Sequence, residues 1–213
     1  MTYKEWKEEF TDICVNETKP IEKNENIGYT RSVGEFKIVA DGVKNLITDY
    51  SIKSSKWSGK INMDNSLLDD NIAGVKEWNC DISLVDTADD GVVLHEMLHS
   101  CSVSYYSASV YIKNKYIEEA SVEFLTQQIC NKHGILHKAS YTNLVRILEL
   151  VNGSFKYGTD IEFAIELFNI PLPDRYEWFE SKVVDRMKEK DASFEEFNEV
   201  LLFIRELQGG DKK

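Results

Sequence analysis

Apolar residues recur along most of this chain with the 3.6-residue period of amphipathic helices. The pattern predicts helices over residues 3–14, 36–50 and 115–132, and four more in the last third of the chain, over 141–151, 160–168, 174–188 and 193–207. Residues 56–63 and 78–84 instead have strand character, and the second segment alternates strictly between apolar and polar positions. We therefore predict a mostly helical α+β protein, with a small, largely antiparallel sheet ahead of one central apolar helix and a helical C-terminal lobe.

That central helix is predicted to begin near residues 88–91 and to end near Ser102, and it has the most informative pattern in the chain. One face is apolar and is expected to pack on the core, with Val93, Leu94, Met97, Leu98 and Cys101. The opposite face carries three polar residues, His95, Glu96 and His99. The strand predicted over residues 78–84 directly precedes this helix, and we expect it to be an exposed sheet edge that could align an extended peptide.

The three polar residues form an H-E-x-x-H motif. On a helix, His95 and His99 stand one turn apart, about 6 Å along the axis, so both imidazoles can bind one ion from the same side. Glu96 lies beside them, where its carboxylate can accept a proton from a metal-bound water. Alternatively, both histidines are surface or hydrogen-bonded core residues and the motif is accidental. A strongly apolar helix with three polar groups on one face favours the metal site.

A catalytic zinc site normally has a third protein ligand. The longer pattern H-E-x-x-H-x-x-G-x-x-H fails here, because Ser102 and Tyr105 occupy the positions of its glycine and last histidine. His133 and His137, at and after the end of a predicted helix, are expected to be surface residues. Asp160 is a weaker candidate. The better candidates are therefore carboxylates on the helix predicted over residues 115–132.

Three glutamates lie on that helix. Glu119 and Glu123 are four positions apart and share a face, whereas Glu118 begins an apolar row and is expected to be an exposed charge near the helix N-terminus. Adjacent helix positions point about 100° apart, so only one of Glu118 and Glu119 can face the ion. We predict Glu119. The alternative is that these glutamates form an exposed acidic face without a metal.

Together, the two helices resemble those of the gluzincins, the thermolysin-like zinc metallopeptidases. In that family H-E-x-x-H is followed, on a second helix about twenty residues on, by E-x-x-x-D. The resemblance covers about residues 78–130 and implies one catalytic zinc ion in a zincin-like fold. It makes His95, His99 and Glu119 the zinc ligands and Glu96 the general base. Glu123 would take the place of the family's aspartate, which hydrogen-bonds a zinc-bound histidine, so this chain departs from the pattern there.

The segment from Glu119 to Thr126 also looks like small metallopeptidases of bacteria and phages, and regulator-cleaving metallopeptidases of mobile elements share a similar pair of motifs. The resemblance implies hydrolysis of a peptide or protein substrate by zinc-activated water. The tetrahedral oxyanion also requires a hydrogen-bond donor, for which the sequence offers Tyr105, Tyr106, Tyr141 or His133 without choosing among them. The rival functions are a regulatory or non-catalytic zinc-binding protein, and a zinc hydrolase of non-peptide amides or esters.

Length and composition limit the domain organisation, the partners and the location that can be expected for this chain. A chain of 213 residues fits a single domain, predicted here over residues 1–213 with an N-terminal lobe of about 1–108 and a helical lobe of about 109–208. A net charge of −12 argues against nucleic acid or an anionic membrane surface as the main partner. No segment has the length and apolarity of a transmembrane helix, and the charged N-terminus lacks a signal-peptide pattern, so we expect a cytoplasmic location.

Overall fold

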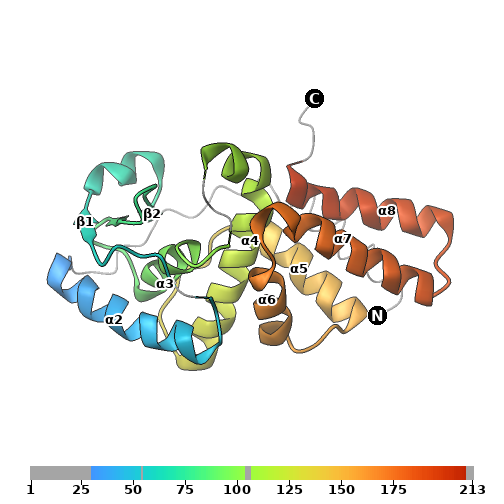
Figure 1. Ribbon diagram of the computed structural model, residues 1–213, viewed down its shortest axis with the longest axis horizontal. Coiled ribbons are helices and arrows are strands. Elements are labelled where there is room, and N and C mark those ends of the chain that lie inside the picture. The colour runs from blue at the N-terminus through green and yellow to red at the C-terminus, as the bar shows by residue number, and fades with distance from the viewer. Residues whose placement is uncertain (1–29, 54, 104–106, 210–213) are drawn as a thin grey trace.

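The computed structural model describes residues 30–53, 55–103 and 107–209 and has a mostly helical α+β fold with one small sheet (Figure 1). The strands are β1 (Ile61–Met63), β2 (Gly74–Lys76) and β3 (Ile82–Leu84). The helices are α2 (Val33–Asp49), α3 (Asp90–His99), α4 (Ala108–His133), α5 (Thr142–Phe155), α6 (Asp160–Asn169), α7 (Leu172–Glu189) and α8 (Phe194–Ile204), with short 3₁₀ helices η1 (Asn65–Asp70) and η2 (Arg205–Gln208). The helix predicted over residues 3–14 lies outside the described residues.

The other predicted helices are confirmed, and the differences at their ends have local causes. Helix α2 begins earlier than predicted because Ser32 and Glu35 form a capping box ahead of the first apolar position. Helix α4 also begins earlier, since it continues upstream through a kink at Asn114, where φ is −117° and ψ is 16°. It ends at Gly134, whose left-handed backbone with φ of 65° closes the helix.

The sheet differs from the prediction in three ways. Its strand order is β1-β3-β2, with β1 parallel and β2 antiparallel to β3, so the sheet is mixed. The strand predicted over residues 78–84 is formed by its last three residues only, because Cys80 has a left-handed φ of 65° in the turn that joins β2 to β3. As β3 is paired on both sides, the prediction that this segment is an exposed edge is wrong. Strict alternation identifies the two faces of a strand but not its neighbours.

Helix α4 runs through the middle of the fold. In Figure 1, α2, the sheet and α3 lie on one side of it, and α5 to α8 lie on the other. Nearly every side chain from Ile117 to Cys130 is buried, because α3, α5, α6 and α7 pack around this part of the helix. The polar residues of α4 are therefore held inside the protein and need partners there. Within the described residues, no helix combines the length and apolarity required to cross a membrane.

Candidate metal centre

Helix α3 holds the H-E-x-x-H motif in a buried position. Its N-terminus is capped by Asp89, whose carboxylate accepts a hydrogen bond from the Val92 N–H at 2.8 Å. The predicted apolar face is confirmed as part of the core. The opposite face is buried as well, since the exposed fractions of His95, Glu96 and His99 are only 6%, 7% and 6%. Three buried polar groups on one helix face point to a site with a ligand or strong internal partners.

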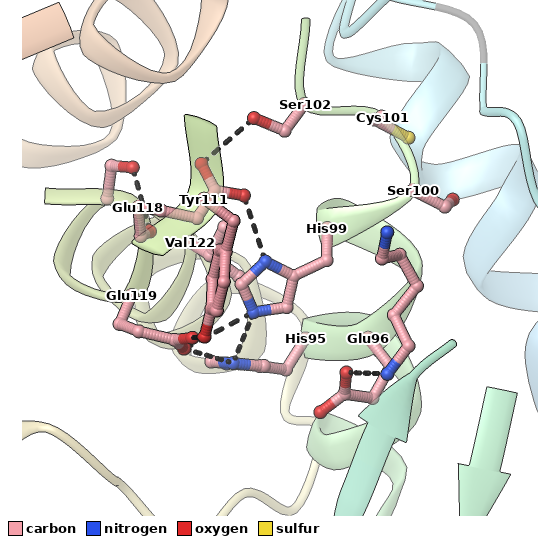
Figure 2. A network of polar contacts seen from close by, with 12 residues as sticks. His95, Glu96, His99, Ser100, Cys101, Ser102, Tyr111, Glu118, Glu119 and Val122 are labelled. Atoms are coloured by element: carbon pink, nitrogen blue, oxygen red, sulfur yellow. Dashed lines mark hydrogen bonds and ion pairs between the residues drawn. The ribbon is translucent and has the colours of Figure 1, made fainter. Parts of the chain in front are cut away.

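Three donor atoms converge between α3 and α4 (Figure 2). The Nε2 atoms of His95 and His99 are 3.1 Å apart, and Glu119 Oε2 lies 3.6 Å from the first and 3.3 Å from the second. In a tetrahedral site with metal–donor distances of about 2.0–2.1 Å, neighbouring donors are about 3.3–3.4 Å apart. The triangle therefore fits one face of a tetrahedron, and this buried group could hold a metal ion.

The outer nitrogen of each imidazole bonds to a different glutamate of α4. His95 Nδ1–H donates to Glu123 Oε2, and His99 Nδ1–H donates to Glu118 Oε1, both at 2.9 Å. Because an ionised carboxylate can only accept, these bonds favour the tautomers in which both Nε2 atoms carry lone pairs. Two lone pairs facing each other repel unless a cation lies between them. A proton or a metal ion at the triangle would meet this requirement.

The charges around the triangle agree with this requirement. Burial opposes the charged form of His99, but Glu119 and Glu118 outweigh it and raise the pKa of His99 to about 9. Burial likewise opposes a charge on His95, while hydrogen bonds to Glu119 and Glu123 raise the pKa of His95 well above its usual range. A metal ion must displace protons held in this way, so metal affinity is expected to rise with pH.

Glu118 is not the exposed charge that the sequence predicts. Its side chain is fully buried, and its Oε2 atom accepts hydrogen bonds from Ser102 Oγ at 2.9 Å and from Arg175 Nη1 at 2.6 Å. The prediction was wrong because a buried cation from α7 offsets the cost of placing this carboxylate in the apolar row. Glu118 faces the back of the His99 ring, while Glu119 is the glutamate that joins the donor triangle.

His137 is likewise not a surface residue, since its side chain is only 5% exposed. Its Nε2 atom lies 2.9 Å from Glu123 Oε1, and its Nδ1 atom lies 3.5 Å from Asp89 Oδ1. Burial opposes a charge on this ring, but Asp89 and Glu123 raise the pKa of His137 to about 9. Gly91 makes room for it, because a Cβ atom at position 91 would lie only 2.3 Å from His137 Cβ and Nδ1. His137 thus supports Glu123, which in turn bonds to His95.

Two tyrosines border the donor triangle. The Tyr111 hydroxyl donates to Glu119 Oε1 at 2.5 Å, which leaves the other oxygen of this carboxylate facing the imidazoles. The Tyr141 ring is stacked on His95, with ring centroids 6.2 Å apart and an interplanar angle of 13°. Burial and the nearby charge of Glu119 raise the pKa of Tyr141, so its hydroxyl keeps its proton at neutral pH. Tyr141 therefore carries a hydrogen-bond donor on a ring that stacks on His95.

Two of the remaining candidates from the sequence, His133 and Asp160, bond to residues outside this cluster. Tyr105 and Tyr106 lie outside the described residues. His133 is exposed at the end of α4, where its Nε2 atom lies 2.7 Å from the Tyr50 hydroxyl. Asp160 begins α6 and accepts a hydrogen bond at 2.7 Å from an asparagine of α5. The donor set therefore includes neither His133 nor Asp160.

The side chain of Glu96, on the same helix as the two histidines, reaches from α3 to the sheet. The Lys76 N–H of β2 donates to Glu96 Oε2 at 2.7 Å, and Figure 2 draws this bond as the dashed line at Glu96. Gly74 of β2 allows this close approach, because a Cβ atom there would lie 2.8 Å from Val92 Cγ1 and 3.1 Å from Glu96 Cγ. Strand β2 is thus an edge strand of the sheet whose Lys76 N–H fixes the Glu96 carboxylate.

Neither a known protein family, nor a curated protein, nor a solved structure matches this chain. The interpretation of the site therefore depends on its own geometry. Sequence reasoning missed Arg175, Ser102 and His137 as parts of it. For His137 a usable signal existed, since it follows the helix-ending Gly134 closely enough to fold back on α4. Arg175 lies 57 positions from Glu118 in the sequence, so the local pattern contained no signal that the two side chains meet.

Proposed function

We propose that this protein is a zinc-dependent peptidase of the gluzincin type, with His95, His99 and Glu119 as zinc ligands and Glu96 as general base. The observation that carries this proposal is the donor triangle with Glu96 on the same helix face. Two imidazole nitrogens and one carboxylate oxygen are a known donor set of catalytic zinc, which leaves a fourth position for water. Magnesium and calcium instead prefer six or more oxygen ligands, so this donor set favours zinc.

In such a site zinc lowers the pKa of a bound water and polarises the carbonyl of the substrate. Glu96 accepts a proton from the attacking water and transfers it to the leaving amine, so one water is added as the peptide bond is broken. The Tyr141 hydroxyl donates a hydrogen bond to the oxyanion that forms on the carbonyl. Glu123 and Glu118 keep the two imidazoles in the tautomer that binds the ion.

A peptide is the substrate class that the surroundings of Glu96 favour. An extended chain can pair with an edge strand through backbone hydrogen bonds, and β2 lies at the edge of the sheet next to Glu96. Because the Lys76 N–H is already bonded to Glu96, a substrate would use the remaining backbone groups of β2. This replaces the segment at residues 78–84, which the sequence suggested for the same role. Pairing along β2 would bring a substrate carbonyl past the proposed base and the zinc ligands.

Metal content and hydrolysis should be measured together on the wild type, Glu96→Gln and His95→Ala, with an unfolded protein such as reduced casein as substrate. We expect about one zinc per chain and cleavage for the wild type. Glu96→Gln should keep the metal and lose cleavage, because only the proton acceptor changes, and His95→Ala should lose both. Zinc binding without cleavage would favour a regulatory zinc protein, and turnover of esters alone would favour a non-peptide hydrolase. Substantial peptidase activity in Glu96→Gln would refute the proposed mechanism.

A further inference from the structure

Arg175 is a fully buried arginine near the start of α7. Its Nη1 atom donates to Glu118 Oε2 and to Ser121 Oγ, both at 2.6 Å. Its Nη2 atom donates to Ser102 Oγ at 3.1 Å and to the Phe168 carbonyl at 2.9 Å. The guanidinium therefore connects the end of α6, the segment after α3, and α4. Such complete hydrogen bonding of a buried cation indicates a fixed position.

These contacts lead directly to the donor triangle. Glu118 accepts from Arg175 with one oxygen and from His99 Nδ1–H with the other, so the guanidinium and the imidazole share one carboxylate. A buried carboxylate needs partners that hold it in place, and Arg175 bonds to the Glu118 oxygen that His99 does not use. With Arg175 in place, the other Glu118 oxygen stays at His99 Nδ1, and the His99 Nε2 atom faces the donor triangle.

We propose that Arg175 is a positioning residue for the metal centre, acting through Glu118 on His99, and that it couples the corner between α6 and α7 to metal binding. This inference rests on the metal-binding part of the proposed function and not on peptide hydrolysis. The corner has a second link to the same region, since the Leu172 N–H donates to the Val103 carbonyl at 2.9 Å. Metal binding should therefore stabilise this corner as well as α3 and α4.

The coupling can be tested first without any substitution. Hydrogen exchange of the wild type is measured with and without cobalt, a spectroscopic substitute for zinc. Because metal binding fixes His99, Glu118 and Arg175 together, amide exchange at residues 168–175 should slow when cobalt is added. Slowing confined to α3 and α4 would overturn the coupling. Failure of the wild type to bind cobalt or zinc would instead refute the proposed function itself.

Three variants then test whether Arg175 acts through Glu118. Arg175→Met removes the guanidinium, and the double variant Arg175→Met with Glu118→Gln removes both charges but keeps an acceptor for His99 Nδ1–H. Arg186→Met is the matched control, because Arg186 lies on the same helix in an exposed ion pair with Glu189. Each variant is titrated with cobalt, and the visible absorption of the bound ion reports its coordination geometry.

We expect Arg175→Met to bind cobalt about 10- to 100-fold more weakly and with an altered spectrum. The double variant should recover most of the affinity and the wild-type spectrum, and Arg186→Met should behave as the wild type. If Arg175 only packs the corner, the double variant will bind as weakly as Arg175→Met, which would overturn the inference. Wild-type affinity in Arg175→Met would overturn it equally. If Arg175→Met does not fold, Arg175→Lys, which keeps the charge but loses the fork, should show a smaller loss of the same kind.

Discussion

A substitution of Gly91 by alanine tests the packing that supports the metal centre. Gly91 lies in the first turn of α3, and an added Cβ would stand 2.3 Å from His137 Cβ and Nδ1 and 2.4 Å from Cγ. Contacts this short require His137 to move. Its displacement would break the bond to Glu123 Oε1, and Glu123 is the residue that holds His95.

Opposing effects determine how far Gly91→Ala changes the free energy of unfolding. Alanine favours a helix over glycine by about 1 kcal/mol. Overpacking costs about 1–3 kcal/mol, and loss of a hydrogen bond to a charged group costs about 1.5–3 kcal/mol. We therefore expect Gly91→Ala to lower the free energy of unfolding by about 1.5–5 kcal/mol. Zinc affinity should fall roughly tenfold, because His95 loses a well-supported partner.

Gly42→Ala is the matched control, since Gly42 lies inside α2 with no atom within 4 Å of an added Cβ. Here only the helix preference acts, and the substitution should stabilise the protein by about 0.5–1 kcal/mol. Urea unfolding of both variants without metal, followed by zinc titration, measures the two effects. If Gly91→Ala stabilises the protein as Gly42→Ala does, the role assigned to the contact with His137 is wrong.

Three further substitutions test individual residues. Asp89 and Glu123 raise the pKa of His137 from 6.5 to about 9, so its charge stabilises the fold fully below about pH 6.5 and this contribution is lost as the pH rises through about 9. In metal-free protein, the difference in unfolding free energy between the wild type and His137→Asn should therefore shrink over this range, and a constant difference would contradict the reasoning. Glu119→Gln should weaken zinc binding at least about 100-fold and abolish the rise in Tm on zinc addition; an unchanged affinity would exclude it as a ligand. Tyr141→Phe should lower kcat by about 10²- to 10³-fold with unchanged zinc content, and a near-normal kcat would remove it as the oxyanion donor.

The parts of the site that depend on local periodicity could be predicted from the sequence. His95 and His99 lie one turn apart on one helix. The choice of Glu119 over Glu118 used the angle between adjacent helix positions, the helix face that Glu119 shares with Glu123 and the resemblance to gluzincins. The placement of Glu123 beside His95 agrees with its spacing from Glu119. These relations hold in any α-helix, whatever packs against it, and so they are visible without knowledge of the fold.

The interactions that depend on tertiary packing could not be predicted in this way. Glu118 looked like the exposed start of an apolar row because nothing near it in sequence could neutralise its charge, and Arg175 reaches it only after α6 and α7 have packed on α4. The prediction about the strand at residues 78–84 was wrong for a similar reason. The apolar alternation of residues 78–84 was real, but the left-handed Cys80 ended the strand and its two neighbours came from other segments.

The bond between Glu96 and Lys76 also bears on the solubility of the protein. A strand at the edge of a sheet offers unpaired backbone groups that can recruit a strand from another molecule, and proteins commonly block such edges with charged groups. In β2 the Glu96 carboxylate occupies the Lys76 N–H. Removal of the whole side chain, as in Glu96→Ala, would leave that N–H open and favour edge-to-edge self-association. A glutamine keeps an oxygen at the same place, so Glu96→Gln should leave the Lys76 N–H occupied and is the variant better suited to experiments in solution.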